Sequence, residues 1–194
     1  MVNYPTKKKP NPSQTIRPTQ TKKGMSLEDD LNQSNSYYRE MDVAIVHKKP
    51  TPITVVSVDY PARSKARITE AYYRMASTTD YNGIYKGKML DFEAKETHNK
   101  TSFSLNNIHT HQIDHMVSIR KHGGIAFLII RFVSLDETYL LFIEELEEFV
   151  KMNTRQSLPY AWIVENAYRI PYKLGCPIPY LSVLDSTYFK GVTP

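Results

Sequence analysis

Apolar residues recur along this chain with two different spacings, and each spacing predicts a kind of secondary structure. Leu27 and Leu31 lie about one helical turn apart, behind Ser26 and beside a run of three acids, so a capped helix is expected that reaches about Tyr38. A second apolar stripe predicts a helix over residues 109–121, which the two glycines that follow would end.

Shorter apolar runs predict strands between and after these helices. They fall at residues 43–46, 53–58, 84–86, 88–96, 125–133 and 138–143. Gly87 separates two of these runs and predicts a hairpin. Residues 64–75 fit either a strand or a helix, residues 97–107 are expected to be polar loop, and residues 144–152 fit a surface helix. The last forty residues predict only short mixed elements, and the whole pattern predicts an α/β fold with a mixed core.

The composition fits one globular domain with an appendage. The chain has 194 residues, of which 41% are hydrophobic, enough to fill a core and to exclude disorder over the whole length. Cys176 is the only cysteine, which excludes a disulfide scaffold. The longest uncharged apolar run, residues 125–130, is too short to cross a bilayer, and no apolar segment follows the first lysines as in a secretory signal. We therefore expect a soluble, cytoplasmic protein without a membrane partner.

The charge is divided unevenly between the first 24 residues and the rest. Residues 1–24 hold six basic and no acidic side chains together with four prolines, whereas the other 170 residues carry 19 basic and 20 acidic ones. Such a segment cannot bury enough surface to offset the entropy of ordering it, so a disordered basic tail is expected ahead of a folded domain at residues 25–194. The tail suits a polyanion such as DNA, or it serves only to keep the chain in solution.

A second basic stretch lies inside the folded part, at residues 47–75. It carries six lysines and arginines against two acids, with three tyrosines among them. Basic and aromatic side chains together can hold phosphates and stack on bases, although an ordinary solvated hairpin or helix can have the same composition. Because this material is poor for a core, residues 47–76 are expected to protrude. Residues 136–148 hold six acids and no base, so that face should point away from nucleic acid.

The residues that carry candidate chemistry lie around the expected hairpin. Alternate side chains on a strand face opposite sides, so Glu93 and Lys95 would emerge together on the polar face of a half-buried strand, opposite Phe92. Pairing around Gly87 would bring Asp80 close to Glu93. Two carboxylates can hold Mg²⁺ at a phosphodiester, where the ion lowers the pKa of a bound water, and a lysine can stabilise the extra negative charge.

The spacing of an aspartate and a later Glu-x-Lys resembles the PD-(D/E)xK nuclease fold, a restriction-endonuclease-like mixed sheet flanked by helices. A simple surface ion pair of Glu93 with Lys95 is the alternative. Glu28 lies on the helix before the first strand, where it serves as a further catalytic acid or only as a favourable charge at the helix start. Gln112 lies on the helix after the hairpin, where this fold often adds a polar group.

Three other features support weaker hypotheses. His111 and His115 are four residues apart on an expected helix, which is a zinc-like spacing, but no cysteine and no third well-spaced ligand joins them. Cys176 is interpreted as a packed core residue rather than a nucleophile. The glycines lack the spacing of a phosphate-binding loop and are interpreted as turns.

Longer motifs resemble those of the RecU-type Holliday junction resolvases of Gram-positive bacteria. They follow one another over about residues 24–135 and comprise residues 24–32 (GMSLEDDLN), 37–38 (YY), 44–52 (AIVHKKPTP), 77–87 (STTDYNGIYKG), 91–97 (DFEAKET), 99–103 (NKTSF), 111–113 (HQI) and 115–116 (HM). The N-terminal tail and the part after about residue 150 match only loosely.

The resemblance implies a homodimeric, Mg²⁺-dependent endonuclease, with Mn²⁺ able to substitute, that resolves four-way DNA junctions by symmetric paired nicks in recombination and repair. It implies a metal site of Thr78, Asp80, Glu93 and Gln112, with Lys95 as the stabiliser of the transition state. One chain carries one such set and a junction needs two cuts, so a two-fold dimer also agrees with the symmetry of the substrate.

The resemblance further implies that residues 47–76 form a stalk that enters the junction centre, with DNA contacts from Lys48, Lys49, Arg63 and Tyr73. Recombinases and branch-migration factors are implied as additional partners. Two other functions stay open: a non-catalytic protein that binds and remodels junctions during strand exchange, and a nuclease of the same fold that cuts linear duplex.

Overall fold

The computed structural model describes residues 26–74, 78–152 and 154–190, so the tail expected at residues 1–24 lies outside the described residues. The α-helices of the described part are α1 Leu27–Glu40, α2 Thr110–Lys121, α3 Ile143–Met152, α4 Tyr160–Asn166 and α5 Tyr180–Thr187. The strands are β1 Ile45–Lys48, β2 Ile53–Asp59, β3 Arg67–Tyr73, β4 Tyr81–Tyr85, β5 Lys88–Thr97, β6 Ser102–Ser104, β7 Ile125–Phe132, β8 Glu137–Phe142, β9 Ser157–Pro159 and β10 Tyr168–Ile170.

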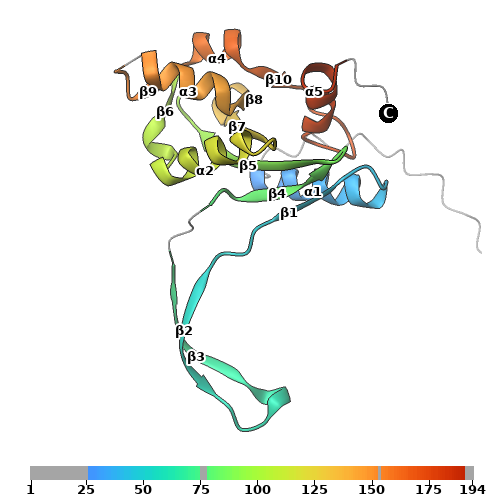
Figure 1. Ribbon diagram of the computed structural model, residues 1–194, viewed down its shortest axis with the longest axis vertical. Helices are drawn as coiled ribbons and strands as arrows, with labels where there is room; N and C mark the ends of the chain where they lie inside the picture. The colour runs from blue at the N-terminus through green and yellow to red at the C-terminus, as the bar shows by residue number, and fades with distance from the viewer. Residues whose placement is uncertain (1–25, 75–77, 153, 191–194) are drawn as a thin grey trace, which may run out of the picture.

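Six of these strands form one mixed sheet, which confirms the predicted α/β class. Its strand order is β1-β4-β5-β7-β8-β10. β5 and β7 run parallel, and the other neighbours run antiparallel. α2 lies between β5 and β7 in the sequence, so it is the crossover helix that a parallel pair requires. The sheet stands in the middle of the upper body of the molecule, with helices on both faces (Figure 1).

Helices bury both faces of the sheet at β7, and this strand is accordingly apolar at every position but one. Phe127 and Ile129 face a core that α1 and α5 cover, whereas Leu128 and Ile130 face a second core that α2, α3 and α4 cover. A strand enclosed on two sides reads as a continuous apolar run, which is why its prediction needed no alternation. None of the helices in the described ranges is long and apolar enough to cross a membrane.

α1 begins where the sequence predicts it, and its first turn is capped from two directions. The Ser26 hydroxyl accepts a hydrogen bond from the Asp29 N–H (3.2 Å), and the Asp29 carboxylate accepts one from the Ser26 hydroxyl (2.9 Å). From the sheet, the Glu96 carboxylate accepts one from the Leu27 N–H (2.7 Å). The start of α1 is therefore fixed against β5.

β1 starts at Ile45, two residues later than the sequence predicts. Asp42 has a positive φ of 53°, and the N–H groups of Val43 and Ala44 donate to the carbonyl of Tyr38 at 2.8 and 3.4 Å. Because these two amides close the end of α1, they are not available to the sheet.

β4 and β5 form the hairpin that Gly87 predicts. Lys86 and Gly87 have φ values of 45° and 72°, the left-handed backbone that a two-residue turn requires. From this turn the pairing runs without a break until Tyr81 lies opposite Phe92. The residue before Tyr81 therefore lies at the open end of the hairpin, beside the residue of β5 that follows Phe92.

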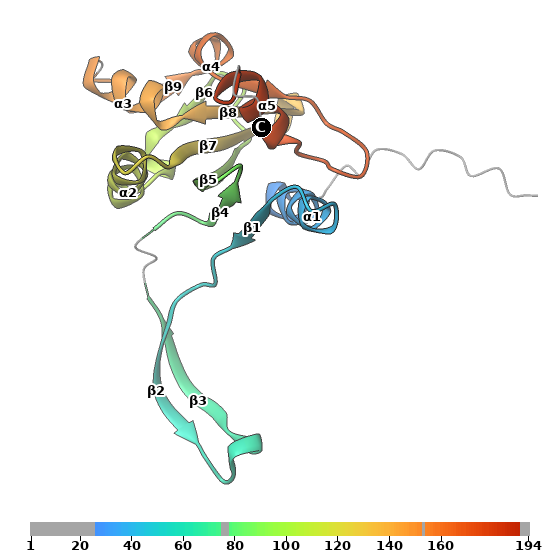
Figure 2. The same cartoon turned by 45° about the vertical axis from the view of Figure 1, so that its right-hand side comes forward.

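β2 and β3 form a second hairpin, here named the protruding hairpin (residues 53–73), which stands well away from the sheet (Figures 1 and 2). Its strands pair antiparallel from Ile53 with Tyr73 to Asp59 with Arg67, and every residue of both strands is exposed. The ambiguous stretch at residues 64–75 is therefore mainly a strand, preceded by a short 3-10 turn at Arg63–Lys65.

The prediction of a polar loop at residues 97–107 is partly wrong, because this segment contains β6, which pairs with β9. Phe103 at the centre of β6 is fully buried in the core beneath α2, α3 and α4. The other two residues of β6 are serines. A strand of three residues with one apolar side chain is too short to show the alternation from which a strand is predicted.

Candidate active site

Asp80 and Glu93 lie side by side at the open end of the β4–β5 hairpin, as the sequence predicts. Asp80 directly precedes β4, and its N–H donates to Oε2 of Glu93 at 3.1 Å. The two carboxyl groups also interact, because the charge of Asp80 and a side-chain hydrogen bond with it both raise the pKa of Glu93. Two carboxyl groups from adjacent segments thus share one small volume.

The environment of Glu93 differs from the half-exposed polar face that the sequence predicts. The side chains of Glu93 and Asp91 are fully buried, whereas Lys95 is 26% exposed. Asp91, Glu93 and Lys95 form a row on the face of β5 that α2 covers. Only Lys95, at the end of this row, reaches the surface. The face is polar as predicted, but the expectation that Glu93 would emerge from the half-buried strand was wrong, because strand alternation does not say what lies above a face.

Burial raises the pKa of the Glu93 carboxyl to about 7. The ammonium of Lys95, with Nζ 2.6 Å from Oε1 of Glu93, opposes this shift, and the nearby charge of Asp80 adds to it. Without a cation, the site therefore holds one carboxyl group that is only partly ionised at neutral pH.

Asp91 joins a polar cluster next to Glu93 that the sequence analysis did not single out. It accepts a hydrogen bond from the hydroxyl of Thr79 and one from Nζ of Lys49 (2.9 Å). Nε2 of His115, on α2, lies 3.3 Å from Oδ1 of Asp91. The signal was present in the sequence, since Asp91 precedes Glu93 by two residues and so shares its face of the strand.

Neither Thr78 nor Gln112 contacts the carboxyl group of Asp80 or Glu93 among the described interactions. Thr78 lies two residues before Asp80 and is half-buried. Gln112 is buried on the first turn of α2, where its side-chain oxygen accepts a hydrogen bond from the His109 N–H (3.0 Å).

Glu28 lies at the start of α1 and is exposed. Its carboxylate forms an ion pair with Lys48 at the end of β1, at 2.5 Å. Burial raises the pKa of the Tyr81 hydroxyl, and the nearby charges of Glu28 and Asp80 raise it further. Glu28 is thus near the site, but among the described interactions it contacts Lys48 rather than Glu93.

The four candidate DNA contacts are spread along the path from the sheet to the tip of the protruding hairpin. Lys48 and Lys49 lie where β1 leads into the hairpin, and both ammonium groups pair with carboxylates of the body of the molecule, namely those of Glu28 and Asp91. Tyr73 ends β3 opposite Ile53, at the base of the hairpin, with 84% of its surface exposed, whereas Arg63 lies in the turn between β2 and β3 at the other end.

The residues around Asp80 and Glu93 fit a hard divalent cation. Two carboxyl groups held together in a buried place repel each other, and a cation between them would remove that cost. Within residues 26–74, 78–152 and 154–190, no group of three or more histidine, cysteine, aspartate or glutamate side chains is arranged to hold a metal. That finding gives no support to zinc at His111 and His115. It is compatible with an ion such as Mg²⁺, which takes one or two carboxylates and keeps several waters.

Comparison with known proteins gives one consistent result. The family model described as "Recombination protein U" matches residues 22–186. The Holliday junction resolvase RecU of Geobacillus kaustophilus is 50% identical, over 97% of this chain and 98% of its own length. Proteins of the same name are 54% identical in Leuconostoc mesenteroides, over 84% of this chain and 81% of theirs, and 52% identical in Oceanobacillus iheyensis, over 86% and 87%.

Proposed function

The chain belongs to the RecU family, and we propose that it is a metal-dependent endonuclease that resolves four-way (Holliday) DNA junctions by paired nicks during homologous recombination and repair. The observation that carries the proposal is the pair of Asp80 and Glu93 with Lys95 beside it. Family membership supplies the substrate, and this pair supplies a means of phosphodiester hydrolysis.

The ion that we propose is Mg²⁺, with Mn²⁺ able to substitute. Asp80 and Glu93 would hold it, and Thr78 and Gln112 would complete the set with oxygen atoms, for which Gln112 would have to release the His109 N–H that it now accepts. Such an ion, once bound, lowers the pKa of a bound water and neutralises charge on the scissile phosphate.

Lys95 is proposed to stabilise the transition state. When a water that has lost its proton to solvent attacks as hydroxide, the phosphorus gains a bond before the ester bond breaks, so one additional negative charge develops on the phosphate oxygens. That charge leaves with the sugar oxygen, which takes up a proton from solvent. Lys95 is the partly exposed end of the buried row, and its ammonium on a mobile stem can turn from Glu93 towards those oxygens. Glu28 is proposed to act at the edge of the site, as an acid that holds Lys48 in place.

The protruding hairpin is proposed to be the stalk that enters the junction. Its described residues carry basic side chains and tyrosines and are exposed throughout, so the whole hairpin is open to a partner. Lys48, Lys49, Arg63 and Tyr73 are the proposed DNA contacts. Because these groups suit phosphates and stacking rather than base edges, recognition would depend on junction shape more than on sequence.

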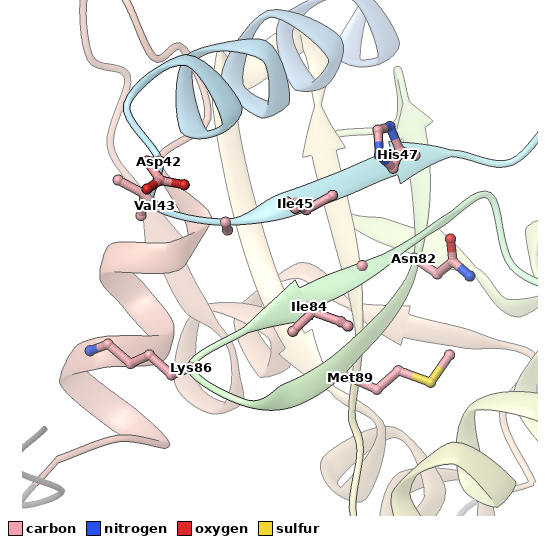
Figure 3. Close-up of a pocket in the computed structure, with 10 residues that line it drawn as sticks. Asp42, Val43, Ile45, His47, Asn82, Ile84, Lys86 and Met89 are labelled. Atoms are coloured by element: carbon pink, nitrogen blue, oxygen red, sulfur yellow. The ribbon is translucent and has the colours of Figure 1, made fainter.

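A second copy of the chain is proposed to pack at the outer side of the sheet edge formed by β1 and β4. A concave surface of about 630 Å³ lies there, lined by residues of β1, β4, the β4–β5 hairpin and the segment that follows α1. Figure 3 shows Ile45, Ile84 and Met89 side by side on adjacent strands, and their exposed fractions are between 41% and 62%. Exposed apolar side chains gathered in this way are typical of an interface between proteins. Recombinases and branch-migration factors are proposed as additional partners.

Incubation of the purified protein with a labelled four-way junction tests the proposed function. The wild type should nick two opposing strands with Mg²⁺ and leave them intact in EDTA. Asp80→Asn should bind the junction without nicking it, and Lys95→Ala should bind but turn over about 10²- to 10³-fold more slowly. Asp114→Asn, which neutralises an exposed acid on α2, is the matched control.

The same assay separates the other two functions. Junction binding with no nick by the wild type, in Mg²⁺ and in Mn²⁺, would support a protein that only binds and remodels junctions. Cleavage of linear duplex at the rate of junction cleavage would support a duplex nuclease of the same fold.

A further inference from the structure

Asp91 is a fully buried carboxylate that no step of the proposed reaction uses. Its side chain has no exposed surface, and it lies on β5 two residues before Glu93. An isolated carboxylate in such a place would lose the hydration that stabilises its charge, which is a large cost unless partners replace the water. The residues that bond to the Asp91 carboxylate therefore show which elements of the fold it connects.

Two of the partners come from the two legs that connect the sheet to the protruding hairpin. Lys49 is the residue after β1, on the leg that leads out to β2, and its Nζ lies 2.9 Å from Oδ2 of Asp91. Thr79 lies between β3 and β4, on the leg that returns, and its hydroxyl donates to Oδ1 of Asp91.

The two legs also bond to each other at this point. Lys49 Nζ donates to the Thr79 hydroxyl (2.9 Å), and the Lys49 N–H donates to the carbonyl of Asp80 (2.7 Å). One carboxylate on β5 therefore closes a small network that joins the base of the hairpin to the sheet.

This network adjoins both acids of the proposed metal site. Thr79 precedes Asp80 in the chain, and Asp91 shares a strand face with Glu93. The contacts of Asp91 thus fix one leg, with Asp80 on it, relative to the strand that carries Glu93. A shift of the leg would change the separation of the two carboxyl groups, and displacements of about 1 Å are enough to slow a reaction about 100-fold.

We propose that Asp91 is a positioning residue: it holds Lys49 and Thr79 at the base of the protruding hairpin against β5, so that the hairpin and the Asp80–Glu93 pair are set by one network. This inference rests on the proposed function, because it assigns Asp91 a part in junction cleavage. It gives the free protein a physical link between the element that would grip the junction and the carboxylates that would cut it.

Asp91→Asn tests the proposal, since the amide keeps the size of the side chain and removes its charge. With a saturating four-way junction and Mg²⁺, kcat should fall about 10- to 100-fold, while KM and the affinity for the junction stay within about twofold of wild type. Asp114→Asn should leave all three quantities unchanged. A wild-type kcat in Asp91→Asn would overturn the proposal, and so would a loss of junction affinity with kcat unchanged.

A double variant shows whether Asp91 acts through Lys49. Lys49→Met removes the ammonium and keeps most of the apolar stem, so it should lower kcat as well. If the two residues act as one unit, Asp91→Asn combined with Lys49→Met should be no slower than the slower single variant. Multiplied losses in the double variant would contradict the network.

Amide hydrogen exchange in the metal-free protein gives a readout that does not depend on cleavage. The N–H groups of Lys49 and Asp80 are bonded within the network and at its edge. In Asp91→Asn they should exchange at least about tenfold faster, while amides in β8 keep the wild-type rate. Unchanged exchange at both positions would overturn the inference even if the wild type cleaves junctions. Faster exchange in a protein that did not cleave junctions would support the network of Asp91 and contradict only its part in cleavage.

Discussion

At the scale of single residues, the central observation is a carboxyl group that the fold encloses at a cost. The Glu93 side chain is fully buried, and the neighbouring Asp80 adds a second negative charge. The ammonium of Lys95 offsets part of this cost and leaves the pKa of Glu93 at about 7. Strained electrostatics of this kind are typical of sites that take a cation, because the cation supplies the charge that the protein lacks.

The raised pKa predicts how stability depends on pH. The pKa of Glu93 is about 7 in the folded chain against an ordinary 4.5, so the folded state binds the proton more tightly than the unfolded state. The free energy of unfolding of the metal-free protein should therefore fall as pH rises through the window from about 4.5 to about 7. The full effect of such a shift, above pH 7, is on the order of 3 kcal/mol.

The side chain of the Glu93→Gln variant cannot ionise, so its free energy of unfolding should not show this fall between pH 4.5 and pH 7. In EDTA at pH 8 it should be more stable than wild type by up to about 3 kcal/mol, and at pH 4.5 the difference should nearly vanish. Denaturant unfolding at both pH values measures this, with Asp114→Asn as the control. Parallel pH profiles for wild type and Glu93→Gln would contradict the pKa assignment.

The nearness of Asp80 to Glu93 and the position of Asp91 on the same strand face could be predicted from the sequence, but the burial and the partners of Asp91 could not. A two-residue turn at Gly87 fixes the register of β4 and β5, and the register alone brings the first pair together. The burial of Asp91 depends on α2 lying over β5, and its partner Lys49 is 42 residues away in the chain. Local spacing carries no information on such contacts.

At the scale of elements, the protruding hairpin is the part that needs a partner. Two strands with both faces in water are marginal by themselves. Val55, Val56 and Ile68 are nevertheless exposed on it by 43–56%. Side chains of this kind on an isolated hairpin favour a surface that becomes covered when the protein binds DNA or a second chain.

Arg63→Ala tests the hairpin as the element that recognises junctions. Arg63 lies in the turn farthest along the chain from both legs, so its loss should weaken binding to a four-way junction about 5- to 10-fold, because one phosphate contact is removed. Binding to linear duplex should change by less than about twofold. Gel-shift titrations at fixed salt measure both, and Lys100→Ala removes an exposed charge outside the hairpin as the control. An equal loss on both DNAs would contradict the assignment.

The elements themselves were predictable wherever their apolar runs were long. β7 is one continuous apolar run and α1 has apolar residues one helical turn apart, and both elements lie within about two residues of their expected bounds. The strand β3 stayed ambiguous because neither of its faces is buried, so its sequence carries no alternation imposed by a core. β6 and β9 have three residues each and depend on each other.

At the scale of the whole molecule, the proposed cleavage of two strands needs two active sites. One chain supplies one Asp80–Glu93 pair. A junction has two strands to cut, so a two-fold pair of chains is the simplest assembly that presents two sites symmetrically. The exposed apolar surface of Figure 3 lies next to the root of the hairpin, on the edge strand β1 and its neighbour β4.

Ile84→Lys tests this arrangement. Ile84 is 62% exposed on β4, so a lysine there should not disturb the core, but it would place a charge within the proposed interface. The wild type should be a dimer at micromolar concentration by light scattering, and Ile84→Lys should be largely monomeric. Val164→Lys, at an exposed apolar position of α4, should remain a dimer. A dimeric Ile84→Lys would place the interface elsewhere.

The proposed function depends above all on the binding of a divalent cation by Asp80 and Glu93 of each chain. Titration of Mn²⁺ into metal-free protein, followed by calorimetry or by the paramagnetic resonance of free Mn²⁺, measures this without DNA. The wild type should bind saturably, Asp80→Asn and Glu93→Gln should each weaken binding at least about 10-fold, and Asp114→Asn should match wild type. Binding of equal strength in wild type and both site variants would contradict the account.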